Sequence, residues 1–370
     1  MAFTFFTNYF LTIDIGYRQI KVLQIRKKEN DGIEVVNFGI GNTPKDCIKN
    51  GAIKNKSRVI EEIKKIMLEN NITAKEAKIV MSGTNIITRI IMIDNVPESQ
   101  VEEKVMQEIE SFMPINLEEH RVEFKILDYI NSDGRKKIRI FITAVKKSII
   151  KSYIDILDSL NLKPISVDTP ANSISKLFQK DINLKNLDDK GSRVHKYSKL
   201  DSGAIAVLDL GSETTIVNIL KNKVLEFNRV VLIGSSNIDQ AIFDDIILDK
   251  LKVNLAEQYK KKYGIVARRD YNDDLEWSCS ESAKVVVNEI IKNINNCFDF
   301  YTTRCGGEKI SRIFIVGGGS QLPGLREYIE DVFKIPCYPI NKLEVSGIGF
   351  GDKLDINRIN HLVNALGIAL

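Results

Sequence analysis

The sequence, 370 residues long, lacks any apolar run approaching the roughly 20 residues needed to span a bilayer. Its first ten residues, Met1 to Phe10, are rich in aromatic side chains, but they contain no basic segment, and Thr7 and Asn8 interrupt the apolar run. A strand pattern follows directly. We therefore expect neither a transmembrane helix nor a secretory signal peptide.

Cysteine is scarce, and the cysteines form no recognisable sequence motif. The five cysteines are odd in number and form neither a Cys-x-x-Cys nor a Cys/His pattern; they are Cys47, Cys279, Cys297, Cys305 and Cys337. This usage predicts reduced thiols in the cytosol and argues against a structural zinc site.

A strong charge of one sign is also missing. Lys and Arg number 53 against 49 Asp and Glu, a formal net charge of +4, and the lysines are scattered among glutamates. This pattern is typical of solvated helix faces and does not predict binding to nucleic acid. The composition, 44% hydrophobic and 28% charged, is that of a globular protein, and the chain is long enough for two or more domains.

One stretch, Gly203 to Asn218, reads as two strands joined by a very tight turn. Because glycine permits φ > 0, we expect Gly211 to let the turn bend and approach a ligand closely. Asp209, at the strand end, could hold a hydrated metal ion, and the hydroxyl residues of the turn supply donors for a phosphate chain. Those residues are Ser212, Thr214 and Thr215. A buried hairpin with an aspartate at its strand end is the alternative.

A second copy of this pattern lies near the N-terminus. Leu11 to Ile25 is again strand, Asp-x-Gly turn and strand, with Asp14 and Gly16 in the turn. Two such hairpins, each opening a mixed α/β segment, predict an internal duplication with a nucleotide clamped between the halves.

A third glycine-rich motif occurs late in the chain. The β-branched strand Ile310 to Val316 runs into Gly317, Gly318 and Gly319, and a helix follows. We expect glycine here because a flat base packing on the backbone leaves no room for Cβ. The spacing is not that of a dinucleotide-binding Gly-x-Gly-x-x-Gly fingerprint.

Between these motifs the sequence predicts a meander at 11–15, 19–26 and 33–39, a helix at 56–70 and a strand at 77–82. Residues 86–143 read as a compact unit of three strands and one helix. That helix has an apolar stripe, Val101, Val105, Ile109 and Phe112, which we expect to pack on its own sheet. Residues 181–202 are polar and weakly patterned, as in a surface excursion.

The hairpins resemble the phosphate-1 and phosphate-2 motifs of the actin, sugar-kinase and heat-shock-chaperone superfamily, and the three glycines resemble its adenosine motif. The compact unit looks like the 1C subdomain of the PilM family, the actin-like proteins of the type IV pilus inner-membrane platform. The resemblance spans about Leu11 to Leu370 and is carried by Thr88–Ile91, Val96–Glu98, Glu110–Ile115, Glu118–Asp128, Ile140–Lys147 and Leu162–Asp168.

The resemblance implies an α/β, actin-like (ribonuclease H-like) ATPase fold, with two duplicated domains flanking a nucleotide cleft. The expected divisions are 1–83 for the first part of domain 1A, 84–145 for the inserted 1C subdomain, 146–203 for the return to domain 1A, 204–345 for domain 2, and 346–370 for a C-terminal helix on domain 1A.

It also implies ATP and Mg²⁺ as cofactors, with at most slow ATPase activity. Metal holders would be Asp14 and Asp209, and the catalytic residues would be Asp209 and Asp168, the latter orienting the attacking water. Asp168 could equally cap the helix opened by Pro170. Lys21, seven positions after Asp14, would reach the β and γ phosphates. The full set of implied cofactor-binding residues is Asp14, Gly16, Tyr17, Lys21, Gly211, Ser212, Thr214, Gly234, Glu257, Lys260, Gly317, Gly318 and Gly319.

Three of these positions carry qualifications. Relatives have small hydroxyl residues after the first glycine, whereas here Tyr17-Arg18-Gln19 follow. Relatives more often have Gly-Gly where this chain has Gly234-Ser235. Glu257 and Lys260 share a helix face and would lie beside the ribose and adenine, but an i, i+3 surface ion pair is the simpler alternative.

As a function, the resemblance implies a cytoplasmic protein held at the membrane's inner face by the N-terminal tail of a bitopic PilN-like protein. Other pilus platform and motor proteins are implied as partners, self-association is compatible with the resemblance, and nucleic acid is not expected. The alternatives are an FtsA-like division protein, disfavoured because the sequence ends in an apolar stretch without a basic amphipathic helix, and an acceptor-phosphorylating kinase.

Overall fold

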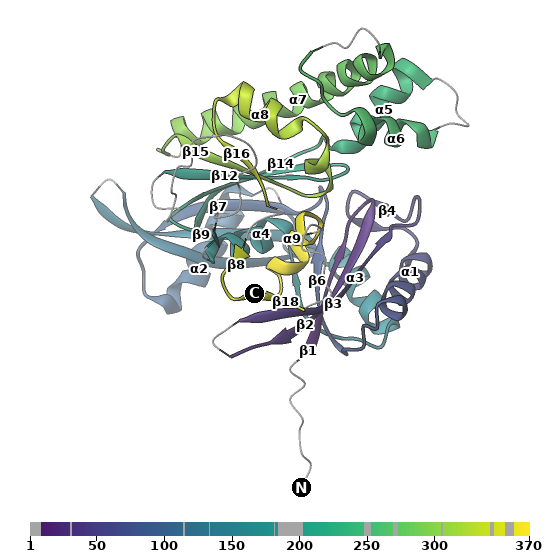
Figure 1. Cartoon of the computed structure of the whole chain (residues 1–370). Helices are drawn as coiled ribbons and strands as arrows, with labels where there is room; N and C mark the ends of the chain where they lie inside the picture. The colour runs from purple at the N-terminus through teal and green to yellow at the C-terminus, as the bar shows by residue number, and fades with distance from the viewer. Residues whose placement is uncertain are drawn as a thin grey trace.

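The computed structural model describes residues 9–29, 32–113, 115–132, 134–180, 182–183, 203–247, 253–268, 273–304, 306–340, 344–351 and 359–370. Most of the predicted excursion at 181–202 and the aromatic start at 1–8 lie outside these ranges. Two large sheets and one small sheet carry the architecture (Figure 1).

The first large sheet has the strand order β10-β6-β1-β2-β3-β18. Its strands are β1 (Tyr9–Ile15), β2 (Gln19–Lys27), β3 (Ile33–Asn42), β6 (Glu76–Met81), β10 (Lys163–Asp168) and β18 (Ile348–Phe350). The predicted meander is confirmed, because β1, β2 and β3 pair antiparallel in sequence order. On the other side, β1 pairs with β6 and β6 with β10, both in parallel.

The second large sheet repeats this plan, in the order β14-β13-β12-β15-β16. Its strands are β12 (Ala204–Leu210), β13 (Thr215–Lys221), β14 (Val224–Val231), β15 (Ile310–Val316) and β16 (Cys337–Pro339). Again three strands form an antiparallel meander and two add in parallel beyond the first. The same pairing pattern in both sheets bears out the internal duplication, with β12 equivalent to β1.

Helices cover the outer face of the first sheet. They are α1 (Lys56–Glu69) and α3 (Lys147–Ser159), which pack on the sheet and on each other. Asn55 caps α1 by accepting a hydrogen bond from the Arg58 N–H, and Val59, Ile63 and Ile66 form its buried stripe. This agrees with the predicted helix at 56–70.

Helices α7 (Asp274–Arg304) and α8 (Leu325–Phe333) pack on the second sheet, where α7 contacts β13 and β14 and α8 contacts β16. Two further helices, α5 (Ser235–Ile242) with its π-helical continuation Phe243–Ile247, and α6 (Val253–Tyr263), pack on α7 and lie beside the sheet, as Figure 1 shows. No helix within the described residues is long and apolar enough to cross a membrane.

Between the two sheets lies a shared layer formed by α4 (Pro170–Gln179) and α9 (Ile359–Gly367). The two helices pack on each other and contact strands of both sheets, as Figure 1 shows. A single hydrophobic cluster joins Leu23, Val207, Ile174 and Leu366, which come from the two sheets and the two helices. The two halves therefore meet through these helices.

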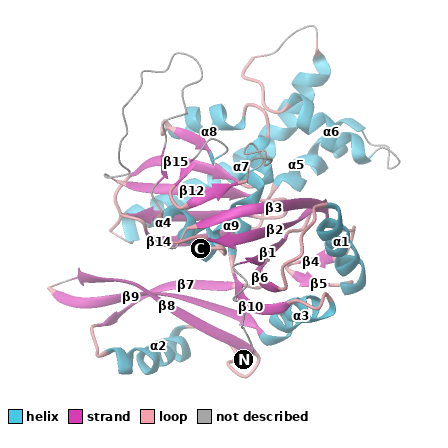
Figure 2. Cartoon of the chain, turned by 60° about the horizontal axis from the view of Figure 1, so that its bottom comes forward, coloured by secondary structure: helices cyan, strands magenta, loops and turns pink. Residues whose placement is uncertain are grey.

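The third sheet belongs to the inserted unit, with strands β7 (Ile87–Asp94), β8 (His120–Ser132) and β9 (Arg135–Lys146) in the order β7-β9-β8. Its helix α2 (Glu98–Phe112) lies on one face of this sheet (Figure 2). Val101, Val105 and Ile109 are buried there as predicted, but Phe112 is 67% exposed. Packing of α2 on its own sheet is thus confirmed without Phe112.

Four two-residue strand segments form two small pairs: β4 (Ile48–Lys49) with β5 (Ala52–Ile53), and β11 (Ile182–Asn183) with β17 (Glu344–Val345).

Strand alternation decides where the two motif aspartates point. In β1, Leu11, Ile13 and Ile15 pack in the outer core, so Asp14 faces the central layer. In β12, Ala206 and Leu208 pack in the outer core of the other half, so Asp209 also faces inward. The equivalent strands of the two sheets therefore present their aspartates toward each other.

Candidate functional site

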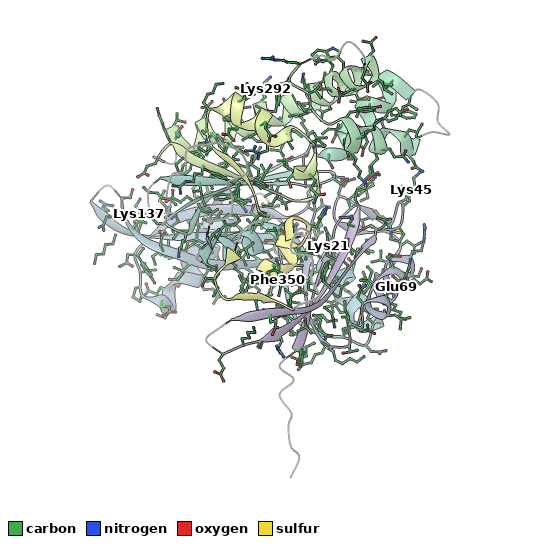
Figure 3. All side chains as sticks on the ribbon, in the orientation of Figure 1. Lys21, Lys45, Glu69, Lys137, Lys292 and Phe350 are labelled. Atoms are coloured by element: carbon green, nitrogen blue, oxygen red, sulfur yellow. The ribbon has the colours of Figure 1, made fainter. Side chains whose placement is uncertain are left out.

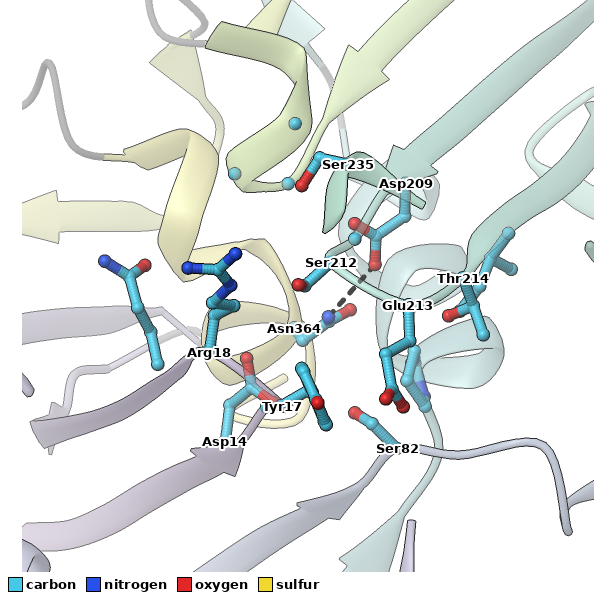
Figure 4. A pocket seen from close by; sticks show the side chains of 18 of the residues that line it. Asp14, Tyr17, Arg18, Ser82, Asp209, Ser212, Glu213, Thr214, Ser235 and Asn364 are labelled. Carbon is cyan, nitrogen blue, oxygen red and sulfur yellow. Dashed lines mark hydrogen bonds between the residues drawn. The ribbon is translucent and has the colours of Figure 1, made fainter. Parts of the chain in front are cut away.

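A cleft of about 850 Å³ opens between the two large sheets and is lined by both hairpins. Its walls also include the start of α4 and the exposed side of α9. Figure 4 shows Asp14 and Tyr17 on one side and Asp209, Ser212 and Glu213 on the other. The sequence prediction that the two hairpins face one another is confirmed.

Both hairpin turns are closed by the same backbone hydrogen bond. The Gly16 N–H donates to the Gln19 carbonyl at 3.0 Å, and the Gly211 N–H donates to the Thr214 carbonyl at 2.9 Å. A Cβ at either glycine would lie within 2.9 Å of that carbonyl oxygen. The predicted φ > 0 at Gly211 is wrong, because this residue is not among the positive-φ glycines. Lack of space inside the turn is what requires glycine.

Asp14 is 2% exposed and pairs with Lys21, whose Nζ lies 3.0 Å from Oδ2. The pairing follows from strand register, since Lys21 stands directly opposite Asp14 on β2. Figure 3 places Lys21 near the centre of the molecule, whereas Lys137 and Lys292 lie at its periphery. Lys21 lines the cleft, and its contact with phosphates stays a prediction.

Asp209 is also buried, at 7% exposed, and burial raises the pKa of its carboxyl group. The amide Nδ2 of Asn364, on α9, donates a hydrogen bond to its Oδ2 at 3.1 Å. A carboxylate so well shielded from solvent stabilises the fold poorly, and its burial is typical of a binding site.

The three glycines after β15 serve the packing of the cleft wall. A Cβ on Gly317, which has φ of 82°, would overlap the Asp209 carboxylate, and one on Gly319 would lie 2.7 Å from the Leu210 carbonyl. Only at Gly318 does the cleft side have room, with His361 at 3.6 Å. The sequence prediction explained all three glycines by contact with a base. The structure instead explains Gly317 and Gly319 by their close approach to β12.

Gly234 does not line the cleft. It begins α5 and packs against Ser212, where a Cβ would overlap the Ser212 carbonyl. The next two backbone N–H groups, of Ser235 and Ser236, donate to the carbonyls of Gly211 and Ser212. This turn therefore supports the second hairpin, and its first N–H groups are already used.

Arg18 bridges the cleft. It extends from the first hairpin and donates to Asp239 on α5 at 2.6 Å and to Glu257 on α6 at 2.8 Å. These partners belong to the other half of the chain. The two halves are thus held together at the cleft mouth by one guanidinium and two carboxylates.

Glu257 and Lys260 both line the cleft, as predicted. They do not form the alternative i, i+3 pair. Glu257 pairs with Arg18 and Lys261, and Lys260 pairs with Asp239 at 2.7 Å. Burial lowers the pKa of Lys260, and although burial alone would raise the pKa of Glu257, Lys261 and Arg18 hold it below its usual value.

Asp168 is outside the cleft lining, although the next residue, Thr169, belongs to it. Its carboxylate accepts hydrogen bonds from the Thr169 N–H at 2.7 Å and from Asn172 Nδ2 at 2.9 Å, and pairs with Lys176 at 2.9 Å. These contacts hold the carboxylate beside the first turns of α4, but they do not cap the helix, whose N-cap is Thr169 and has no side-chain cap bond. The geometry therefore confirms neither the capping alternative nor a role for Asp168 in orienting water.

Tyr17 and Glu213 lie close to each other on opposite hairpins, as Figure 4 shows. Burial raises the pKa of both, and the neighbouring Glu213 carboxyl group raises the pKa of Tyr17 further. The departure at Tyr17-Arg18 from the small residues of relatives therefore has a structural consequence, because both side chains reach across the cleft.

Several buried polar atoms at the cleft have no hydrogen-bond partner among the described residues. They are Asp14 Oδ1, Ser212 Oγ and Asn364 Oδ1. Leaving such groups unpaired is costly, so their convergence on one cleft fits a polar ligand. In the described part of the chain, no three His, Cys, Asp or Glu side chains gather to hold a metal ion. Mg²⁺ needs no such cluster, since one or two carboxylates, phosphate oxygens and waters commonly hold it. Asp14 and Asp209 fit that role.

The sequence interpretation missed Arg18, Asp239, Asn364 and His361 as cleft or bridge residues. Asn364 and His361 carried a weak signal, because they are two of the three polar positions, with Asn360, in an otherwise apolar helix. Arg18 and Asp239 carried none, since their contact joins residues 221 positions apart.

The family model described as type IV pilus assembly protein PilM matches residues 12–370. This chain belongs to the PilM family. No curated protein matched the sequence.

Solved structures similar to this PilM-family chain include the PilM–PilN type IV pilus biogenesis complex, with a TM-score of 0.77 at 19% identity over 97% of each chain. The ethanolamine utilization protein EutJ from Carboxydothermus hydrogenoformans matches with a TM-score of 0.54 at 10% identity, covering 98% of this chain and 89% of that one. MreB5 of Spiroplasma citri bound to AMPPNP matches at 0.50 and 10% identity, covering 98% and 95%. The predicted actin-like ATPase fold is confirmed.

Proposed function

We propose that this PilM-family protein binds ATP with Mg²⁺ in the cleft and docks the cytoplasmic N-terminal tail of a PilN-like membrane protein. The observation that carries the proposal is the symmetry of the site. Asp14 and Asp209 end equivalent strands of the two sheets and face the same cleft of about 850 Å³. A volume of this size suits a nucleotide.

The residues have distinct parts in this proposal. Asp14 and Asp209 hold the hydrated cation, and Lys21 and the two turns contact the phosphates. Bound Mg²⁺ supplies charge neutralisation at the β- and γ-phosphate oxygens. The base lies toward Gly318, the glycine with room on its cleft side. Because the Asp168 carboxylate is engaged elsewhere, the site is suited to binding with at most slow hydrolysis.

Calorimetric titration with Mg·ATP tests the nucleotide site. Asp209→Ala should abolish measurable binding, because it removes one of two buried carboxylates in the cleft. Asp94→Ala, at the exposed end of β7, is the matched control and should bind as the wild type does. An Asp209→Ala protein with wild-type affinity would overturn the assignment.

The inserted unit is in contact with the second sheet, which supports coupling between nucleotide and partner. Arg139 on β9 pairs with Glu226 on β14 at 2.7 Å, and each side chain is only 14% exposed. Thr88 on β7 donates to Asn228 on β14 at 2.6 Å, and both line the cleft. A change in the cleft that shifts β14 must therefore also move the inserted unit or strain its contacts with β14.

We place the partner's tail between the first sheet and the inserted unit, which would hold the protein at the inner face of the membrane. Labelled peptides of that tail can be titrated by fluorescence anisotropy with and without Mg·ATP. Coupling between sites is commonly about 5- to 150-fold in affinity. Arg139→Met should reduce the nucleotide effect, whereas Arg135→Met, exposed on the same strand, should not. A wild-type affinity for the tail that is the same with and without Mg·ATP would contradict the coupling.

A further inference from the structure

The C-terminal helix α9 lines the cleft with His361, Val363 and Asn364. Leu362, Val363, Ala365 and Leu366 are buried in the central layer. Asn364 interrupts this apolar run and lines the cleft. An amide at such a position needs partners, because a polar group in an apolar layer is otherwise destabilising.

One end of the Asn364 amide is satisfied by Asp209. A carboxylate can only accept, so the amide turns its NH₂ group to Asp209 Oδ2, at 3.1 Å. The amide oxygen is left buried and, among the described residues, without a partner. Figure 4 shows Asn364 between the side chains of Asp14 and Asp209.

Two more oxygen atoms share this condition. Asp14 Oδ1 and Ser212 Oγ are also buried without partners in the described chain, and they come from the first and second hairpin. Three structural elements therefore present an unsatisfied oxygen to the same cleft. Hydrated Mg²⁺ keeps several waters, and each water needs acceptors of this kind.

We propose that Asn364 is a positioning residue for the Mg²⁺–phosphate site. Its amide nitrogen fixes the Asp209 carboxylate, and its amide oxygen accepts a hydrogen bond from a water held by the cation. An amide supplies this oxygen without a third negative charge, which would repel the triphosphate. The proposal rests on the proposed function, that Mg·ATP binds in this cleft, and adds the C-terminal helix to the site.

The test separates cation dependence from nucleotide binding itself. A fluorescent ATP analogue is titrated into wild type and Asn364→Ala, in EDTA and over a series of Mg²⁺ concentrations. Loss of one charge-assisted hydrogen bond should raise the half-saturating Mg²⁺ concentration about 10- to 150-fold. The affinity measured in EDTA should change less than about twofold. Asn37→Ala, an exposed amide on β3, is the matched control.

Asn364→Asp gives an independent reading, because it keeps the size of the side chain and adds a charge. This variant should bind nucleotide more weakly in EDTA and recover with Mg²⁺ more than wild type does. Equal losses with and without Mg²⁺, or an unchanged Mg²⁺ requirement in both variants, would overturn the proposal. Wild-type protein that binds no nucleotide would instead overturn the proposed function itself. Melting temperatures of all variants report on folding.

Discussion

Replacing Arg18 by alanine should strengthen nucleotide binding. Arg18 holds Glu257, the carboxylate expected beside the ribose, and also Asp239. A nucleotide that takes Glu257 must first release it from Arg18. Since the guanidinium is already paired with two carboxylates, its removal takes away little attraction for a triphosphate.

The size of the effect follows from the exposure of the three side chains. Arg18 is 43% exposed, Glu257 36% and Asp239 12%, so one contact is largely exposed and the other partly buried. Exposed pairs contribute about 0.2–1 kcal/mol and partly buried charge-assisted contacts about 1.5 kcal/mol. Because only the exposed contact with Glu257 has to open, the gain is about 0.2–1 kcal/mol, which corresponds to roughly 1.4- to 5-fold in affinity.

Fluorescence titration with Mg·ATP at two salt concentrations measures this change. The gain of Arg18→Ala over wild type should shrink at high salt, because screening weakens the bridge in the wild type. Arg121→Ala, which removes an exposed pair with Glu123 on β8, is the control and should have no effect. Weaker binding by Arg18→Ala would show that the bridge assembles the site and would refute the reasoning.

Two further predictions concern packing and pH. Gly317→Ala should abolish Mg·ATP binding in a calorimetric titration and lower the melting temperature, because its Cβ would overlap the Asp209 carboxylate. Gly318→Ala should leave the melting temperature unchanged, because its Cβ would have room, and equal melting temperatures of the two variants would contradict this. Burial lowers the pKa of Lys78 to about 8 from 10.5, so the folded state binds fewer protons than the unfolded state between these values and stability rises with pH there. Lys78→Met should remove this rise. In thermal unfolding between about pH 8 and 10, the melting temperature of the wild type should therefore increase relative to that of the variant. A difference in melting temperature that does not change with pH would contradict the prediction.

Local patterns in the sequence predicted much of the fold. Alternation in β1 and β12 sends Asp14 and Asp209 to the inner faces, and the glycine turns fix the hairpins. The same period places Lys21 opposite Asp14. The alternation of side chains along a strand and the residue preferences of tight turns depend on only a few neighbouring residues. Both can therefore be predicted without knowing how the two halves meet.

Contacts between the halves could not be predicted in this way. Arg18 and Glu257 are 239 positions apart, and Asn364 reaches Asp209 only because α9 returns to the central layer. Tertiary structure decided these two positions, and local propensity did not. Asp168 is different, because its partners Thr169, Asn172 and Lys176 all follow within 8 positions, yet the sequence alone left its role open.

A crystal structure of the protein with Mg²⁺ and a nonhydrolysable ATP analogue tests the central claim most directly. It should show the triphosphate between the turns at residues 16–18 and 211–214, the base beside Gly318, and Glu257 released from Arg18. A nucleotide bound on an outer surface, or one that leaves either hairpin without contact, would contradict the account.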